Sequence, residues 1–374
     1  MKILFDARTA ISRFPGIGRY AAELAPALAE IIGETGDEFA IIANSASIDL
    51  LTASKNIQAV PCDIPPDAPE SYQTIQTLIA EIKPDVYHTP HRMCHPATGV
   101  ATVLTVHDCI PVKCPFQTTP QERIVFLASV GNALRACTRA ITVSQTTLDD
   151  LNEFFPGETE KCRVVHHGVD EHFSPTSTAQ HDAVAEKNKY PRPALLYIGS
   201  NLRHKNLVEL FRGFARARPL LHGANLVLGG FGCTPVARHS RLIDSLDLAD
   251  CVTWIGEVTE KDLPAVIGSA TAFVMPSLYE GFGLPALEAL ACGTPVACSD
   301  IAALREVCAQ AACYFDPESP DAIAQALVSV VSDDIVRSRI RLAGLNRARD
   351  FTWRNAAQKT LAVYREAIEN QPNQ

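Results

Sequence analysis

Short apolar runs rich in β-branched residues alternate with amphipathic helical patterns along most of this 374-residue chain. Residues 2–6 and 101–106 are predicted to be buried strands, while apolar residues at helical spacing span 16–32. Such alternation is typical of α/β proteins, because parallel strands need a crossover connection that is usually a helix. The first half also predicts strands at 39–43, 85–88, 140–144 and 163–166, and helices at 70–82, 120–137 and 145–154.

The alternation stops in a polar, proline-bounded segment at 171–193 and then starts again. We predict that this segment is a linker between two domains, since a chain of this length exceeds one ordinary hydrophobic core. The predicted boundaries are 1–178 for an N-terminal Rossmann-like domain, 179–352 for a C-terminal one, and 353–374 for a C-terminal helix that packs back on the N-terminal domain. The second half predicts strands at 194–199, 225–230, 252–255, 272–275 and 295–298, with helices at 205–217, 235–246, 260–269 and 284–292.

The expected fold class is therefore α/β, with two doubly wound domains that face each other across a cleft. Open parallel sheets bind ligands outside the carboxyl ends of their strands, at the point where the strand order reverses. The residues that directly follow each predicted strand are consequently the first candidates for a functional site.

Composition excludes several classes of protein. Hydrophobic residues make up 47% and charged residues 20%, as in an ordinary globular protein, and the net charge of −9 disfavours a nucleic-acid surface. The 12 cysteines are scattered without a CxxC pair, which favours buried, reduced thiols. No apolar stretch is long enough for a membrane span and the first residues do not resemble a signal peptide, so we expect a cytoplasmic protein.

The segment 276–295, PSLYEGFGLPALEALACGTP, carries the strongest indication of a site. It follows a predicted strand, passes through a glycine-rich turn at Gly281–Gly283 and enters a helix with Pro285 in its first turn. Backbone N–H groups at such a turn and helix start can hold a phosphate or a sugar hydroxyl. Glu280 precedes the turn and Glu288 lies within the helix, so the two carboxylates can bind separate parts of one ligand. An isolated pair of this spacing is more often a surface feature.

This segment resembles the E-x7-E signature of the retaining glycosyltransferases of family 4, which have the GT-B fold of two Rossmann-like domains. Other segments resemble the same family in the same order along the chain. GIGRY at 16–20 is similar to its glycine loop and TVHDCIP at 105–111 to its histidine-bearing loop, most closely in the bacterial mannosyltransferase branch. The remaining similar segments are AITVS at 140–144, HHGVD at 166–170, and YIG at 197–199 through Lys205 and Asn206.

The resemblance implies which residues form the site. His107, Lys205 and Glu280 would be the catalytic residues, with the backbone carbonyl of His107 near the reacting carbon of the donor sugar. Glu280 and the amides of the turn would hold sugar hydroxyls, Glu288 would hold the ribose, and the loop of His88 and His91 would shape the acceptor site. The implied donor-binding residues are Gly16, Gly18, Arg19, Arg203, His204, Lys205, Glu280, Gly281, Phe282, Gly283, Leu284 and Glu288.

The basic residues at 203–205 are expected to bind a nucleoside diphosphate, because negative charge develops on that group as it leaves. The family usually has Arg-Lys-Asn where this chain has His204, Lys205 and Asn206. Lys205 is therefore the expected partner of the diphosphate, assisted by either Arg203 or His204. The alternative is a solvated, basic start of a helix.

Three patterns suggest other chemistry. Residues 16–21 fit the dinucleotide fingerprint G-x-G-x-x-A, but a dehydrogenase has its glycines directly after the first strand and an acidic residue after the second. His107 and Asp108 suggest acid–base work, yet adjacent residues of a strand point to opposite faces. HTPHRMCH at 88–95 contains zinc-ligand residue types, but their spacing fits no zinc pattern. We expect no metal and no cofactor other than the nucleotide-sugar donor.

The resemblance predicts retaining transfer of a hexose from a nucleotide sugar to a saccharide or lipid-linked saccharide. GDP-mannose is the favoured donor, followed by UDP-glucose and other UDP-hexoses. A GT-B-like epimerase or phosphorylase and a non-catalytic nucleotide-sugar-binding protein are the alternatives. We expect no nucleic-acid partner and at most peripheral contact with the inner face of the membrane.

Overall fold

The computed structural model describes residues 1–11, 15–51, 57–97 and 99–371. The chain forms two compact units: Met1–Gly168 together with Phe351–Gln374 make up unit 1, and Val169–Asp350 make up unit 2. The chain therefore passes between the units twice. The first passage comes before the boundary expected at 178–179, and the C-terminal helix expected at 353–374 belongs to unit 1.

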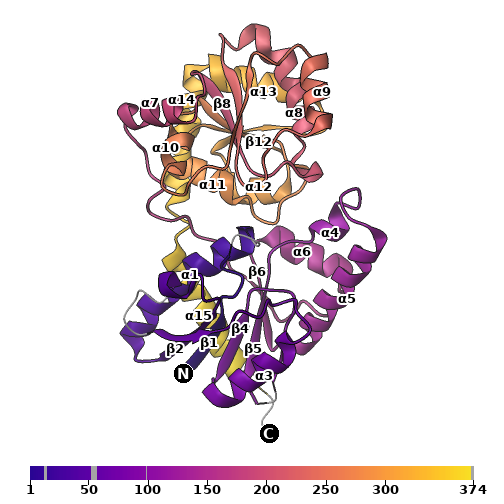
Figure 1. The fold of residues 1–374 in the computed structure, drawn as a ribbon, viewed down its shortest axis with the longest axis vertical. Helices are drawn as coiled ribbons and strands as arrows, with labels where there is room; N and C mark the ends of the chain where they lie inside the picture. The colour runs from indigo at the N-terminus through magenta and orange to yellow at the C-terminus, as the bar shows by residue number, and fades with distance from the viewer. Residues whose placement is uncertain (12–14, 52–56, 98, 372–374) are drawn as a thin grey trace. The chain divides into compact units, whose positions relative to one another are not determined.

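Unit 1 is built on a parallel sheet. The strands are β1 (Lys2–Asp6), β2 (Glu38–Ala43), β3 (Ile57–Pro61), β4 (Val86–Thr89), β5 (Ala101–Val106), β6 (Arg139–Thr142) and β7 (Cys162–Val164). In the described part of the unit these seven strands follow the order β3-β2-β1-β4-β5-β6-β7. The order reverses between the neighbours β1 and β4, so a ligand is expected where these two strands end (Figure 1).

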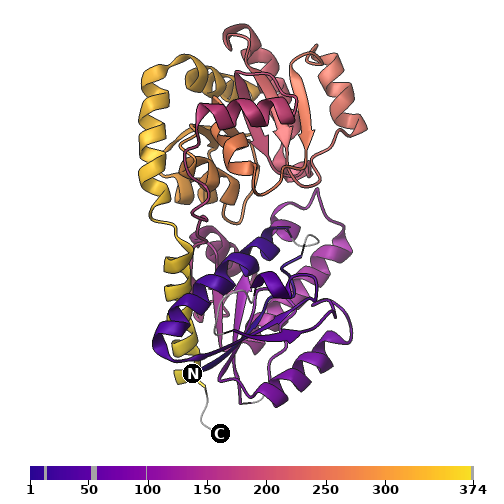
Figure 2. The same cartoon turned by 60° about the vertical axis from the view of Figure 1, so that its left-hand side comes forward.

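The helices of unit 1 include one from each end of the chain. They are α1 (Pro15–Thr35), α2 (Ile48–Leu51), α3 (Ser71–Ile82), α4 (Ile110–Lys113), α5 (Pro120–Ala136), α6 (Gln145–Phe154) and α15 (Trp353–Glu369). The yellow α15 lies beside the indigo α1 in both views (Figures 1 and 2). Trp353, Leu361 and Tyr364 of α15 are buried in the same core cluster as Tyr20 and Leu24 of α1. Burial of this apolar face fixes α15 to unit 1.

Unit 2 repeats the architecture. Its strands are β8 (Ala194–Ile198), β9 (Asn225–Gly229), β10 (Val252–Gly256), β11 (Ala272–Met275), β12 (Val296–Ser299) and β13 (Ala312–Phe315). Within the described residues these six strands form a parallel sheet in the order β10-β9-β8-β11-β12-β13, which reverses between β8 and β11. The helices are α7 (Thr178–Lys187), α8 (Leu207–Ala217), α9 (Ala237–Ser245), α10 (Leu263–Gly268), α11 (Leu284–Ala291), α12 (Ala302–Cys308), α13 (Pro320–Ser332) and α14 (Asp334–Ala348), with 3-10 turns η1 (Arg203–Lys205) and η2 (Arg218–Leu220). The expected α/β class with two doubly wound sheets is confirmed.

The linker prediction for 171–193 is wrong over ten residues, because the segment contains helix α7. The backbone N–H of Ser177 donates to the side chain of Gln180, and the Ser177 hydroxyl accepts from the Gln180 N–H. This capping box starts a helix whose apolar periodicity is too weak to reveal it. The strands β3 and β13, at the edges of the two sheets, were also outside the prediction.

Among the helices that the structure describes, none has the length and apolar character needed to cross a membrane.

Candidate active site

The loops after β8 and β11 meet where the strand order of unit 2 reverses. The loop after β8 leads through Gly199 to η1, and the loop after β11 runs from Pro276 to Gly283 at the start of α11. The backbone N–H of Leu278 donates to the carbonyl of His204 at 2.8 Å, which ties the two loops together. Two segments that were identified separately in the sequence therefore lie side by side in the structure.

Lys205 and Glu280 form an ion pair across these loops. The distance from Lys205 Nζ to Glu280 Oε1 is 2.6 Å, and only 17% and 9% of the two side chains are exposed. Attraction between such charges is stronger than on an open surface, because less water screens them. The pair places one cation and one carboxylate side by side, which suits a ligand that carries both anionic groups and hydroxyls.

His204 and Arg203 differ in charge. His204 is buried, and this burial, with a smaller effect of the neighbouring Lys205, lowers the pKa of the imidazole to about 4. Its ring is therefore neutral at pH 7 and cannot supply a positive charge to a phosphate. Arg203 is exposed, and a guanidinium is a permanent cation in proteins. Of the two residues, Arg203 is therefore the candidate to assist Lys205.

The glycine-rich turn before α11 depends on Gly283. Its φ of 103° lies in the left-handed region, and a Cβ there would come within 2.6 Å of Leu304 Cδ2. Glu280 and Phe282 are both buried on the turn. Glu288 lies inside α11 and is only 2% exposed, so the two glutamates have different surroundings although both were expected to touch one donor.

The glycine loop of unit 1 begins α1 after β1. A Cβ at Gly18 would lie 2.6 Å from the carbonyl oxygen of Thr9, so packing within the loop itself requires glycine there. A Cβ at Gly16 would meet nothing within 4 Å, and Gly16 is exposed. The half-buried Arg19 follows in the first turns of α1. Of the two glycines, Gly16 is thus the one that leaves room for a ligand.

His107 follows β5 and is neutral. Burial lowers the pKa of the imidazole to about 4, and a bond to the carbonyl of Pro90 only partly opposes this. Because that carbonyl, 3.2 Å from Nε2, can only accept, the proton of the neutral ring lies on Nε2 and the lone pair is on Nδ1. The carboxylate of Asp108 instead accepts from the N–H of Ile110 at the start of α4. One carboxylate oxygen of Asp108 is therefore engaged with the backbone at the start of a helix.

The two acceptor candidates are buried. His88 has no exposed surface, and its ring nitrogens lie 2.6 Å from Tyr364 Oη and 2.8 Å from Thr105 Oγ1. Both nitrogens are engaged inside unit 1, which argues against direct contact between His88 and an acceptor. His91 is 2% exposed, and its Nδ1 accepts from the N–H of Met93 at 3.3 Å.

The histidines of HTPHRMCH do not converge. His95 Nε2 lies 3.1 Å from Ser71 Oγ, away from the bonds of His88. Over the described ranges, the structure brings together no group of three or more His, Cys, Asp or Glu side chains that could hold a metal ion.

A buried ion pair at the end of β1 was not predicted from the sequence. Arg8 binds Asp6 through Nη2–Oδ2 at 2.7 Å and Nε–Oδ1 at 2.9 Å, and donates to Ser71 Oγ and the Ile64 carbonyl. Burial alone would raise the pKa of Asp6, but the charge and hydrogen bonds of Arg8 bring it below its usual value. The D-x-R spacing that starts with the last residue of the first strand is a signal that could have revealed the pair. Its bonds hold the loop at the β1–β4 reversal.

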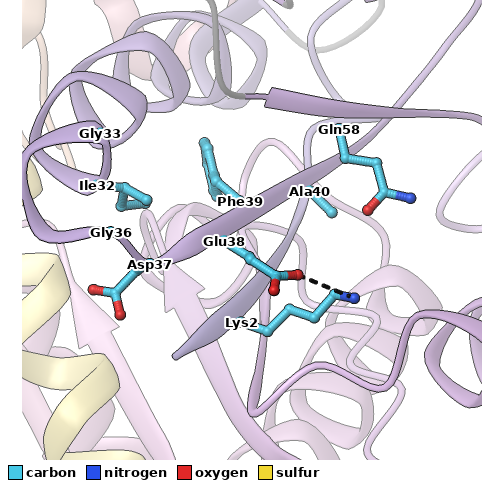
Figure 3. Close-up of a pocket in the computed structure, with 9 residues that line it drawn as sticks. All are labelled: Lys2, Ile32, Gly33, Gly36, Asp37, Glu38, Phe39, Ala40 and Gln58. Carbon is cyan, nitrogen blue, oxygen red and sulfur yellow. Dashed lines mark ion pairs between the residues drawn. The ribbon is translucent and has the colours of Figure 1, made fainter.

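A surface pocket of about 350 Å³ lies at the opposite edge of the same sheet (Figure 3). Lys2 and Glu38, which begin β1 and β2, form an ion pair of 3.3 Å at its side. The pocket is therefore at the amino ends of the strands, away from the residues described above.

Two family models match the chain. The model described as Glycosyltransferase Family 4 matches residues 15–173, and the one described as Glycosyl transferases group 1 matches residues 180–347. The chain is 27% identical to O-antigen chain mannosyltransferase B of Escherichia coli, with 98% of this chain and 100% of that protein covered. It is 30% identical to alpha-maltose-1-phosphate synthase of Mycobacterium tuberculosis, over 63% of this chain and 64% of that protein.

Solved structures share the fold. Sucrose-phosphate synthase of Thermosynechococcus elongatus superposes with a TM-score of 0.79 at 18% identity, covering 99% of this chain and 100% of that one. HepE of Anabaena, solved in complex with UDP-glucose, superposes with a TM-score of 0.75 at 17% identity, covering 97% and 99%. The TM-scores show a common fold, at sequence identities below 20%.

Proposed function

Because this chain belongs to the family 4 glycosyltransferases of GT-B fold, we propose that it is a retaining hexosyltransferase that uses a nucleotide-sugar donor. The observation that carries the proposal is the Lys205–Glu280 pair of 2.6 Å where the strand order of unit 2 reverses. A nucleotide sugar has a diphosphate directly beside a ring of hydroxyls. It therefore presents an anion to Lys205 and hydroxyl donors to Glu280 at adjacent positions.

The basic residues would act on the leaving group. Lys205 and the exposed Arg203 neutralise the charge that grows on the diphosphate as the bond to the anomeric carbon breaks. His204 serves through its carbonyl, which holds the loop of Leu278, because its ring is uncharged. Glu280, released from Lys205 by the incoming phosphate, accepts hydrogen bonds from sugar hydroxyls. Glu288 accepts from the ribose.

The residues of unit 1 would position the sugar. Gly16 leaves space for the donor, and the carbonyl of His107 lies near the reacting carbon. The acceptor hydroxyl attacks on the face that the diphosphate leaves, and its proton passes to a diphosphate oxygen. The new glycosidic bond thus keeps the configuration of the old one without a protein nucleophile. His91 remains the residue proposed for the acceptor side.

We propose GDP-mannose as the donor and a saccharide, in lipid-linked form at the inner face of the cytoplasmic membrane, as the acceptor. The similarity to O-antigen chain mannosyltransferase B supports the choice of mannose. The HepE structure with UDP-glucose makes a UDP-hexose the second choice.

The test is calorimetric titration of the purified protein with GDP, UDP, GDP-mannose and UDP-glucose in buffer containing EDTA. Selective binding of GDP and GDP-mannose is expected, followed by transfer of mannose to saccharide acceptors. Turnover of the donor without an acceptor would favour an epimerase, and binding without turnover a non-catalytic protein. Transfer that stops in EDTA and returns with Mn²⁺ or Mg²⁺ would contradict the prediction of metal independence.

A sugar phosphate is the second candidate acceptor, since the similarity to alpha-maltose-1-phosphate synthase covers 63% of the chain. The same assay with soluble sugar phosphates and lipid-linked saccharides distinguishes the two. Faster transfer to the sugar phosphates would reject the lipid-linked acceptor.

A further inference from the structure

Four buried side chains in unit 1 form a continuous chain of hydrogen bonds. Tyr364 Oη lies 2.6 Å from His88 Nδ1, and His88 Nε2 lies 2.8 Å from Thr105 Oγ1. Thr105 Oγ1 lies 3.1 Å from Tyr20 Oη. The four residues come from α15, β4, β5 and α1, and each has at most 1% of its surface exposed. We call this set the α15–α1 hydrogen-bond chain.

The α15–α1 hydrogen-bond chain is uncharged at neutral pH. Burial, with a smaller effect of His107, lowers the pKa of His88 to about 3, although Asp6 opposes this. Burial also raises the pKa of Tyr20 and of Tyr364, so both phenols keep their protons. A neutral imidazole donates from one nitrogen and accepts at the other. The ring of His88 therefore donates a hydrogen bond to one of Tyr364 and Thr105 and accepts one from the other.

Thr105 and Tyr20, at one end of the α15–α1 hydrogen-bond chain, lie next to residues of the candidate site. Thr105 lies in β5, and His107 is the residue that directly follows this strand. The ring of Tyr20 meets the ring of His107 edge-on, with centroids 4.8 Å apart and planes at 81°. Tyr20 also follows Arg19 directly in α1, within the glycine loop. A shift of the Tyr20 ring would thus move both His107 and the start of α1.

We propose that Tyr364 is a positioning residue for sugar transfer: through His88 and Thr105 it fixes the Tyr20 ring, and Tyr20 fixes His107. The inference rests on the proposed function, because it needs His107 and the glycine loop to contact the donor. Tyr364 belongs to the C-terminal helix and is far, in the sequence, from every motif of the site. Small errors in the placement of reacting groups are costly to turnover, whereas binding of the donor can remain intact.

Two pairs of variants separate hydrogen bonding from packing. Tyr364→Phe keeps the ring that packs against His88 and removes only the hydroxyl. Thr360→Val is its control, since Thr360 is buried one turn earlier in α15 and its hydroxyl has no hydrogen-bond partner among the described residues. Thr105→Val keeps the shape of the side chain and loses the bonds. Thr105→Ser keeps the bonds and loses a methyl group.

The measurement is steady-state transfer, with the unfolding temperature of each variant recorded beside it. We expect Tyr364→Phe to lower kcat about tenfold with the KM for the donor within about twofold, and Thr360→Val to leave both unchanged. Thr105→Ser should be more active than Thr105→Val. A role in packing alone predicts the reverse order, because Ser leaves a cavity and Val does not.

The outcomes are distinguishable. Unaltered protein that transfers no sugar with any donor overturns the proposed function, and this inference with it. Active unaltered protein with equal kcat in Tyr364→Phe overturns the inference alone. If Tyr364→Phe fails to fold, the order of the two Thr105 variants still decides.

Discussion

The carboxyl ends of the strands carry different chemistry in the two units. In unit 1, His88 and His107 lie among aromatic rings, and burial lowers the pKa of both so that they are neutral at pH 7. In unit 2, the same edge of the sheet carries the Lys205–Glu280 ion pair beside a glycine turn. The histidines of unit 1 can therefore act through their position, whereas unit 2 presents a charged pair. Substitutions should therefore affect placement in the first and electrostatics in the second.

The largest effect is expected at Lys205. Lys205→Ala should lower kcat on the order of 100-fold, the usual scale for losing one group that stabilises charge in the transition state. Lys187→Ala is the matched control, because Lys187 makes an exposed ion pair with Asp262 in the same unit. Stopped assays of sugar transfer measure both. Unchanged turnover in Lys205→Ala would show that charge at this position does not drive the reaction.

Substitution of the two glutamates should distinguish binding of the nucleotide from binding of the sugar. Glu288→Ala should weaken binding of the bare nucleoside diphosphate about tenfold, whereas Glu280→Ala should weaken binding of the nucleotide sugar more than that of the diphosphate. Calorimetric titration of each variant with both ligands measures this, and each variant is the control for the other. Wild-type affinity for the bare nucleotide in Glu288→Ala would remove the ribose role, in keeping with the 2% exposure of that side chain.

The two glycines of the loop in unit 1 should respond differently. Gly18→Ala should destabilise the protein by about 1–3 kcal/mol, because its Cβ would lie 2.6 Å from the carbonyl oxygen of Thr9. Gly16→Ala has open space and should leave the unfolding temperature unchanged while it weakens donor binding. Thermal unfolding and titration of both variants test the pair. Equal loss of stability at the two positions would mean that neither glycine is reserved for a ligand.

The smallest effect is a dependence of stability on pH. Folding lowers the pKa of His88 from its usual value of 6.5 to about 3, so between these two pH values the unfolded chain binds a proton that the folded chain does not. Stability from this group is complete above pH 6.5 and decreases as the pH falls toward 3. At pH 5.5 the loss is about 1.4 kcal/mol for such a histidine.

Urea unfolding at pH 7.5, 6.5 and 5.5 measures this dependence. His88→Gln should reduce the slope, whereas His222→Asn, at an exposed position of unit 2, should not. Asp6 and His107 also affect the pKa of His88, so both residues stay unaltered in every variant. A flat profile in the unaltered protein would contradict the burial of a neutral His88.

The fold was largely readable because its signals are local. Apolar runs of four to six residues and helical spacing gave β1, β5, β11 and α1 to within a few residues, as periodicity reports burial directly. Helix α7 and strand β3 were missed, since a capping box and a half-exposed edge strand leave little periodic trace. The segments around Glu280 and Lys205 were found because short turns next to strands have their own sequence signals.

The sequence by itself determined the α/β class, the order of two doubly wound sheets and the motifs that identify the family. Only the tertiary structure decided that Lys205 pairs with Glu280, that His204 is neutral, and that His88 is bound by Tyr364, 276 residues away. Local patterns depend on neighbours within a few turns of the chain. Ion pairs, burial and pKa depend on which elements pack together, and no spacing within a motif specifies that.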